Sequence, residues 1–380
     1  MQRLGFNEEH TMFRDAFRSF VEKEVVPHQE QWREDGIVSR EVWRKAGENG
    51  FLLYWADEQY GGLGLRDFRL SQIMMEEMAR VGETGFYLHL HGSLVAPYID
   101  KFGNDEQKSR LLPGCISGEK ILAIAMTEPG AGSDLRGMKT TAVDCGDHYK
   151  LNGSKTFISN GILADYVIVA AKIQVEGKEK IGLLVVERDM PGFERGRNLN
   201  KMGLKSQDTA ELFFNDVTIP KANLLGDPGR GLNYMMECLA EERLIVSCIN
   251  HASAQSAFDW TRDYVNERQA FGQAVAEFQN TRFKMAEMAT ELDICQVYID
   301  RCVEALNDDQ LSAEDAAKIK LFSSEMQGRV VDECLQLFGG YGFMDEYPIS
   351  QAYCDARITR IFGGTSEIMK EIIARSLGLA

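Results

Sequence analysis

A loop at residues 125–134, with the sequence AMTEPGAGSD, concentrates residue types that bind small ligands. Thr127 and Ser133 supply hydroxyls, and two glycines leave backbone N–H groups open to an anionic or heterocyclic partner. The Gly-Ala-Gly run is similar to the start of a dinucleotide fingerprint, but Leu135 stands at the third glycine position and no crossover helix follows. A Rossmann-type site is therefore excluded, and the loop is either a ligand-binding loop or an ordinary hairpin loop.

A second stretch, RIFGGTSEIM at 360–369, places two glycines, two hydroxyls and a carboxylate around the start of a run with helical periodicity. Thr365 is a typical helix N-cap. Glu367, in the first turn, is favourable with the helix dipole. The sequence therefore predicts a turn and a capped helix close to the C-terminus.

Residues that could hold a metal are scattered. His89 and His91 have a spacing that two ligands on a strand could use, but their segment has helical periodicity and no carboxylate or cysteine is arranged beside it. The eight cysteines form no C-x-x-C pair, which favours small core residues in a reducing compartment. We predict no metal site, with both histidines lining a core or a pocket.

The composition restricts the class of protein. The chain has 380 residues, 44% of them hydrophobic, and a formal net charge of -16, which opposes binding to nucleic acid or to an anionic membrane. No apolar run approaches the roughly 18 residues of a membrane span. The N-terminal residues lack an apolar signal region, and Glu8 and Glu9 are unlike a transit peptide. We expect a bacterial cytoplasmic protein, with a processed organellar matrix chain as the alternative.

The pattern of apolar residues divides the chain into three parts. Residues 1–120 show helical periodicity, residues 121–230 carry short β-rich runs separated by turn signals such as Asn152-Gly153, and residues 231–380 return to long helical patterns. Helices are expected from Asn7 to about Pro27 and at 39–49, 66–80, 84–101, 231–266, 274–306, 313–337 and 350–377. The sequence therefore predicts a multidomain α+β protein with a small antiparallel β domain between two helical domains.

Several separated segments together carry a family resemblance. AMTEPGAGSD at 125–134 and LNGSKTFISNG at 151–161 resemble the flavin-binding signature of the acyl-CoA dehydrogenases. RQAFGQ at 268–273, QLFGGYGF at 336–343 and GTSE at 364–367 match the family's later signatures in order and spacing. The resemblance extends over nearly the whole chain, and it implies a helical N-terminal domain, a middle β domain and a C-terminal four-helix bundle.

The resemblance also implies FAD as the cofactor, with contacts carried over by motif. Many family members have Trp and Thr where this chain has Phe157 and Ser159, and both replacements keep an aromatic face and a hydroxyl. The positions implied for the flavin ring are Met126, Thr127, Gly132, Ser133, Phe157, Ile158, Ser159, Thr365 and Glu367. Those implied for the ADP half, reached from a neighbouring subunit, are Arg268, Phe271, Gln279, Gln336, Gly339 and Gly340.

The catalytic base is the point where this chain departs from many family members. They carry a glutamate at the position of Gly363, whereas the long-chain and isovaleryl branch carries it on an earlier helix, directly before an arginine. Glu242, followed by Arg243, occupies that place, and Glu241 points about 100° away around the helix. The resemblance implies Glu242 as the base, with Ser133, Arg243, Gly363 and Gly364 on the substrate side.

The implied reaction is FAD-dependent α,β-dehydrogenation of an acyl-CoA thioester to trans-2-enoyl-CoA. Glu242 would remove the α-proton, a hydride would pass to flavin N5, and electrons would continue to an electron-transferring flavoprotein. KMGLKSQDTAELFF at 201–214 and GGTSEIMKEIIAR at 363–375 are most similar to the long-chain enzyme, which favours medium- or long-chain fatty acyl-CoA of β-oxidation. The alternatives are an isovaleryl-type enzyme, a flavin oxidase or monooxygenase on the same fold, and a non-catalytic flavin-binding protein. A homotetramer built as a dimer of dimers is expected from the family.

Overall fold

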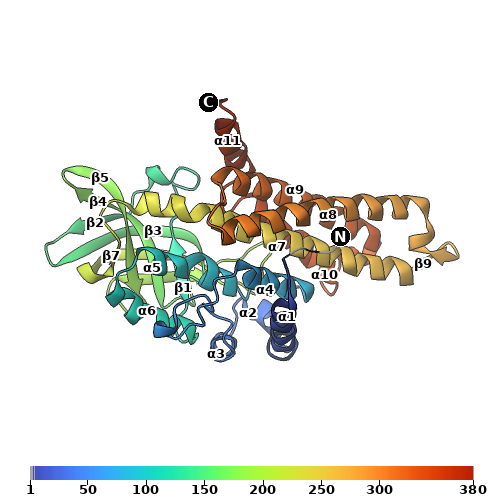
Figure 1. The fold of residues 1–380 in the computed structure, drawn as a ribbon, viewed down its shortest axis with the longest axis horizontal. Coiled ribbons are helices and arrows are strands. Elements are labelled where there is room, and N and C mark those ends of the chain that lie inside the picture. The colour runs from blue at the N-terminus through green and yellow to red at the C-terminus, as the bar shows by residue number, and fades with distance from the viewer. Residues whose placement is uncertain (1–2, 4, 380) are drawn as a thin grey trace.

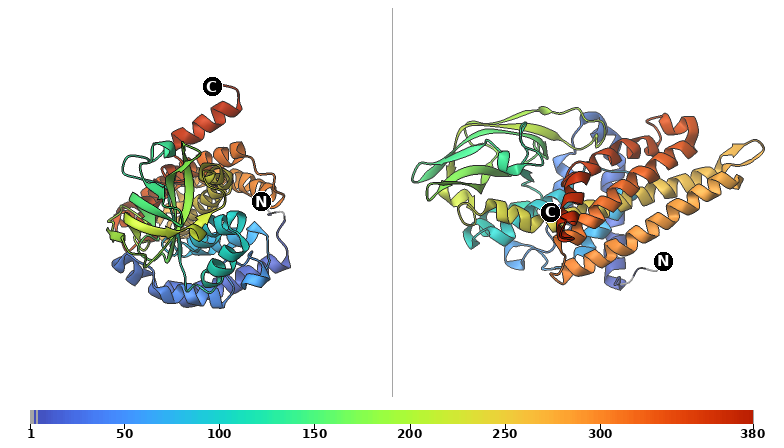
Figure 2. Two further views of the ribbon diagram at one scale, coloured as in Figure 1. Left: turned by 90° about the vertical axis from the view of Figure 1, so that its left-hand side faces the viewer. Right: turned by 90° about the horizontal axis from the view of Figure 1, so that it is seen from above.

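The computed structural model describes residue 3 and residues 5–379, which form an elongated molecule (Figure 1). The β-sheet lies at one end, and three long C-terminal helices run from beside it to the opposite end. The N-terminal helices lie on one side of the molecule, next to the sheet and the nearer part of these helices, and the view from above again shows the sheet and the far ends of the long helices at opposite ends (Figure 2). The predicted order of helices, sheet and helices is confirmed.

Residues 5–120 of the described structure contain six α-helices. They are α1 (Glu8–Phe20), α2 (Gln29–Asp35), α3 (Arg40–Glu48), α4 (Phe68–Arg80), α5 (Ala96–Phe102) and α6 (Asp105–Ile116). Asn7 caps α1, as predicted, because its side chain accepts from the backbone N–H of His10. The helix expected to end near Pro27 instead continues through a π turn (η1, Val21–Val25) and a 3-10 turn (η2, Val26–His28) into α2. Pro27 lies in the first turn of η2, where the chain changes from π to 3-10 geometry and accommodates a residue without a backbone N–H.

The stretch expected as a single helix at 84–101 also differs from the prediction. It begins later, with a π-helical segment (η4, Leu90–Val95), and passes directly into α5. Pro97 occupies the first turn of α5 and cannot donate the backbone hydrogen bond that a continuous α-helix would need. The π turn therefore changes the direction in which the residues of α5 face.

The middle part is a sheet that is antiparallel except at two pairings. Its strands are β1 (Leu122–Ala125), β2 (Thr141–Asp144), β3 (His148–Ser159), β4 (Tyr166–Val175), β5 (Lys178–Glu187), β6 (Phe193–Asn198), β7 (Thr209–Pro220) and β8 (Leu224–Leu225). The strand order is β6-β7-β3-β2-β4-β5-β8, and β1 pairs with β4. The β1–β4 pair is parallel, with Leu122 opposite Tyr166, and β2 meets β4 in parallel at Thr141.

The C-terminal part is built on three long helices. They are α7 (Gly231–Glu267), α8 (Gln279–Asn307) and α9 (Ala313–Phe338), followed by α10 (Pro348–Ala356) and α11 (Ser366–Ser376). A short hairpin, β9 (Gln269–Ala270) with β10 (Gln273–Ala274), joins α7 to α8. The predicted single helix at 350–377 is broken between Arg360 and Ser366, where Gly363 and Gly364 have φ values of 64° and 97°. These left-handed conformations interrupt a helix and favour glycine.

Candidate active site

Glu242 lies on α7 with its carboxyl group inside the molecule. The residue is 8% exposed, and the Tyr98 hydroxyl on α5 donates a hydrogen bond to its Oε1 at 2.8 Å. Burial raises the pKa of Glu242 to about 7, although the hydrogen bond from Tyr98 and the charge of Arg243 act in the opposite direction. A carboxyl group with this pKa gains and loses a proton near neutral pH, as a general base must.

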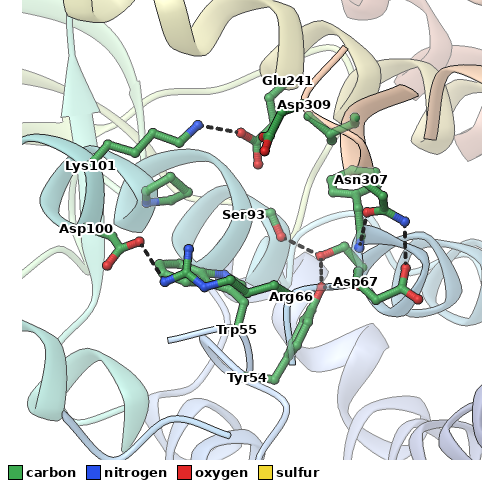
Figure 3. Close-up of a pocket in the computed structure, with 14 residues that line it drawn as sticks. Tyr54, Trp55, Arg66, Asp67, Ser93, Asp100, Lys101, Glu241, Asn307 and Asp309 are labelled. Atoms are coloured by element: carbon green, nitrogen blue, oxygen red, sulfur yellow. Dashed lines mark hydrogen bonds and ion pairs between the residues drawn. The ribbon is translucent and has the colours of Figure 1, made fainter. Parts of the chain in front are cut away.

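Glu241, the neighbouring carboxylate, lies in different surroundings (Figure 3). Its Oε2 accepts from Lys101 Nζ at 3.0 Å, and it lines a cavity of about 350 Å³ between the N-terminal helices and the end of α8. Other charged groups of this cavity are also paired, among them Asp100 with Arg66. Successive residues of a helix point about 100° apart, so Glu242 faces the interior while Glu241 faces a polar, solvent-connected cavity.

Two buried cations lie against the Gly363-Gly364 turn. Lys320 on α9 donates from Nζ to the Gly364 carbonyl at 2.6 Å, and a Cβ placed on Gly364 would lie 4.0 Å from Arg243 Nη2. Lys320 is 0% and Arg243 6% exposed, and Arg243 Nε has no hydrogen-bond partner in the described chain. Burial lowers the pKa of Arg243, and burial with the nearby Arg243 charge lowers the pKa of Lys320 to about 8. Positive charge at this turn suits an oxygen that gains negative charge during a reaction.

A buried ion pair joins the motif at residues 125–134 to the motif at residues 151–161. Lys155, which is 0% exposed, donates to Glu128 Oε1 and to the Met126 carbonyl, each at 2.9 Å. Burial raises the pKa of Glu128, but hydrogen bonds from Thr140, Lys139 and Lys155 outweigh burial and hold the pKa at about 2. The backbone N–H of Thr156 also donates to the Thr127 carbonyl at 3.0 Å. The 125–134 loop is therefore anchored to the end of β3, while Gly132 and Ser133 remain exposed.

The end of β3 borders an apolar cleft. Phe157 has a left-handed φ of 58° and its side chain is 70% exposed, so its ring is available to a ligand. Ser159 and Phe157 line the cleft together with Ile361 and Phe362, which precede Gly363, and the cleft has a volume of about 390 Å³. Ile158 is different, because it is 3% exposed within the sheet core, where only its backbone is left for a ligand.

The residues predicted for the ADP half lie at the other end of α7. Arg268 follows the last residue of α7, and its guanidinium lies 5.5 Å from the Tyr341 ring centroid. Phe271, on the β9–β10 hairpin, is 98% exposed. Gln279, Gln336, Gly339 and Gly340 are exposed as well. At a rise of about 1.5 Å per residue, Arg268 is about 39 Å from Glu242 along α7. The structure thus separates this set from the buried base.

The remaining predicted features are placed as follows. Thr365 caps α11 by accepting from the Ile368 N–H at 3.3 Å, which confirms that prediction, and Glu367 is exposed in the first turn. His91 is buried between the Leu122 N–H and the Cys115 carbonyl, and His89 lines a small cavity. The described residues contain no group of three side chains arranged to ligate a metal. Most of the cysteines are buried and none is in a disulfide, but Cys145 is exposed, contrary to the prediction of core residues.

Three residues of the site were not singled out from the sequence: Tyr98, Lys155 and Lys320. Lys320 could have been found, because it falls on the same helical stripe as the buried Ala316 and Ser323. Lys155 is similarly a cation on an inward-facing position of a strand. Tyr98 gives no such signal, since its partner Glu242 is 144 residues away in the chain.

Among the residues that the structure describes, no helix combines the length and apolar character needed to cross a bilayer.

Comparisons with known proteins agree with these features. Family models match three consecutive parts of the chain: acyl-CoA dehydrogenase N-terminal domain at residues 7–119, middle domain at 123–217 and C-terminal domain at 229–378. The chain is 45% identical to the mitochondrial long-chain specific acyl-CoA dehydrogenase of Mus musculus, over 99% of this chain and 88% of the relative. It is 36% identical to the mitochondrial isovaleryl-CoA dehydrogenase of Pongo abelii, over 98% of this chain and 89% of the relative.

Solved structures agree as well. The acyl-CoA dehydrogenase of Geobacillus kaustophilus superposes with a TM-score of 0.96 at 49% identity, over 99% of this chain and 100% of that one. An acyl-CoA dehydrogenase of Bacillus anthracis complexed with FAD superposes with a TM-score of 0.93 at 34% identity, over 99% of this chain and 69% of that one. The chain described here belongs to the acyl-CoA dehydrogenase family.

Proposed function

We propose that this protein oxidises an acyl-CoA thioester to the trans-2-enoyl-CoA, with Glu242 as the base that removes the α-proton. The observation that carries this proposal is the buried Glu242 carboxyl, with a pKa of about 7, in a chain that has Gly363 where many family members have the base. Glu241 is a weaker candidate because it is ion-paired with Lys101 and faces a polar cavity.

The residues around the apolar cleft fit FAD. An exposed aromatic ring at Phe157, the Ser159 hydroxyl and the apolar side chains of Ile361 and Phe362 suit a flat heterocycle. Thr127, Gly132 and Ser133 would hold its polar edge, with Met126 and the Ile158 backbone beside the ring. When bound, FAD supplies the acceptor for the hydride that leaves the β-carbon of the substrate.

The chain's own residues prepare the substrate for proton removal. An acyl chain entering beside Glu242 displaces water, and this desolvation makes the carboxylate a stronger base. Backbone N–H groups of the Gly363-Gly364 turn would donate to the thioester carbonyl. Lys320 and Arg243 place positive charge behind that turn, where it favours the negative charge that develops on the carbonyl oxygen.

The exposed distal set supports sharing of FAD between subunits. Arg268 lies about 39 Å from Glu242 along α7, and the other residues implied for the ADP half, Phe271, Gln279, Gln336, Gly339 and Gly340, are exposed as it is. We therefore propose that a neighbouring copy supplies them, in a homotetramer built from two dimers. Arg268 would pair its planar guanidinium with pyrophosphate oxygens.

The substrate proposed is a medium- or long-chain fatty acyl-CoA, with an isovaleryl-type branched ester as the alternative. The higher identity to the long-chain relative, 45% against 36% for the isovaleryl relative, supports this order. An electron-transferring flavoprotein is the proposed acceptor, and the proposed location is the bacterial cytoplasm, with an organellar matrix as the alternative.

Anaerobic flavin bleaching tests the function. The purified protein is mixed with acyl-CoA esters from short to long and from straight to branched, and the product is identified by mass. We expect bleaching with one class of ester and formation of the enoyl-CoA. No bleaching with any ester would contradict the dehydrogenase, and oxygen consumption without an acceptor would indicate an oxidase.

A further inference from the structure

The hydroxyl of Tyr98 makes the hydrogen bond that the Glu242 carboxyl accepts within the described chain. We propose that Tyr98 is a positioning residue, which holds Oε1 of Glu242 and leaves Oε2 to receive the α-proton of the substrate. This inference rests on the proposed role of Glu242 as the base. In the transfer, the bond from the α-carbon to hydrogen breaks, the proton joins Oε2, and the electron pair stays on the substrate.

The position of the Tyr98 hydroxyl is fixed by the packing of α5 against α7. Residues 98, 101 and 102 lie on one face of α5, because positions three and four apart on a helix are neighbours. Three side-chain pairs join the helices along this face: Phe102 stacks on Tyr234 with ring centroids 4.0 Å apart, Lys101 pairs with Glu241 at 3.0 Å, and Tyr98 bonds Glu242 at 2.8 Å. Tyr98 is 0% exposed, so water does not compete for its hydroxyl.

The π-helical segment before α5 determines which residues face α7. A π turn contains an extra residue compared with an α turn, so it rotates the residues that follow about the helix axis. Here η4 ends at Val95, and Tyr98 follows three residues later. The Trp55 indole N–H donates to the Gly92 carbonyl inside η4 at 2.9 Å, which satisfies a carbonyl of the irregular turn. Such turns occur often at functional sites, and this one directs a phenol at the proposed base.

The hydrogen bond affects proton affinity as well as orientation. The pKa of Tyr98 is raised well above its usual value, first by burial and then by the charge of Glu242, so Tyr98 remains a donor throughout an assay range. A donor favours the ionised carboxylate, and therefore lowers the pKa of Glu242 against the effect of burial. The titratable and charged groups close enough to act on Glu242 are Tyr98 and Lys101 from α5 and Cys238, Glu241 and Arg243 from α7.

The test is the pH dependence of kcat/KM in Tyr98→Phe, which removes the hydroxyl and keeps the ring. We expect the acid limb to move upward by about one pH unit, as a hydrogen bond to a charged group is worth at least that much. At pH 7 this shift lowers kcat/KM about fivefold, and the limiting rate at high pH does not exceed that of the wild type. Tyr54→Phe is the matched control, because Tyr54 is buried but bonds the Ser71 hydroxyl, and its pH profile should not move.

A second variant covers the case in which Tyr98→Phe does not fold. Replacement of Tyr98 by 3-fluorotyrosine keeps nearly the same volume and makes the phenol a stronger donor, so the acid limb should move to lower pH. An acid limb that stays in place in either folded variant contradicts the inference. This failure is distinct from failure of the proposed base, which would appear as undiminished flavin bleaching in Glu242→Gln.

Discussion

The two ends of α7 present opposite kinds of site. Near its start, Glu242 is buried and bonded to Tyr98, with Arg243 and Lys320 placed behind the Gly363-Gly364 turn. At its end, Arg268 and the hairpin that carries Phe271 are exposed, and Arg268 meets the ring of Tyr341 but has no ion pair in the described chain. One helix thus carries a buried carboxyl group that is bonded within the chain and, at its other end, an exposed arginine beside an exposed hairpin.

This difference separates two requirements of the proposed enzyme. The base needs a dry, fixed environment, which one chain provides by packing α5 against α7. The distal set needs a ligand or a second copy to give its exposed groups partners. Substitutions in the buried site near the start of α7 should therefore affect proton removal, whereas substitutions at its end should affect FAD binding.

The largest expected effect comes from Lys155→Met, on β3 of the middle domain. Removal of one partner of a buried ion pair leaves Glu128 buried without its cation, which should lower the free energy of unfolding by about 3–5 kcal/mol. Urea unfolding measures this loss. Lys150→Met, on the same strand but without an ion pair in the described chain, is the control and should change stability by less than about 0.5 kcal/mol.

Arg268→Ala, at the far end of α7, should weaken FAD binding by about 10- to 100-fold, because the variant loses hydrogen bonds to a charged group. Titration of the apoprotein with FAD measures the affinity. Arg262→Ala removes an exposed arginine of the same helix that pairs with Asp259, and FAD affinity should stay unchanged. An equal loss of FAD affinity in the two variants would mean that Arg268 acts only as a surface charge and does not contact FAD.

A smaller effect is expected for Lys320→Met. Loss of the bond to the Gly364 carbonyl should slow flavin reduction about tenfold, since about 1.4 kcal/mol of stabilisation is lost in the transition state. Stability at pH 7 should stay constant or rise, because burial holds the pKa of Lys320 at about 8 and makes its ammonium costly below that pH. Stopped-flow reduction and urea unfolding, measured side by side, separate the two effects. A parallel fall in both would make Lys320 a purely structural residue.

Much of the fold was predictable from the sequence, because caps and periodicity are local signals. Asn7 and Thr365 cap their helices as expected, and the long helices α7, α8 and α9 lie close to the predicted ranges. The π turn at Leu90–Val95 was not predicted, since a pattern with a period of 3.6 residues does not reveal one additional residue in a turn. The parallel pairing of β1 with β4 was also missed, because it joins strands about 40 residues apart.

The site shows the same division between local and distant signals. Helix geometry places Glu241 and Glu242 about 100° apart, but which of them faces the interior depends on where α5 lies. Tyr98, whose hydroxyl donates a hydrogen bond to Glu242, comes from a part of the chain 144 residues away. Glu242 could therefore be predicted from its sequence motif, whereas Tyr98, which changes the pKa and orientation of its carboxyl group, could not.

The most direct test of the central claim compares Glu242→Gln with Glu241→Gln in single-turnover flavin reduction under anaerobic conditions. With ester binding verified for both variants, Glu242→Gln should reduce the flavin about 10²- to 10⁴-fold more slowly than the wild type. Glu241→Gln breaks only the partly exposed pair with Lys101 and should stay within about fivefold of the wild type. Flavin reduction by Glu242→Gln at the wild-type rate would contradict the assignment of the base. A large loss of reduction rate in Glu241→Gln alone would contradict it as well.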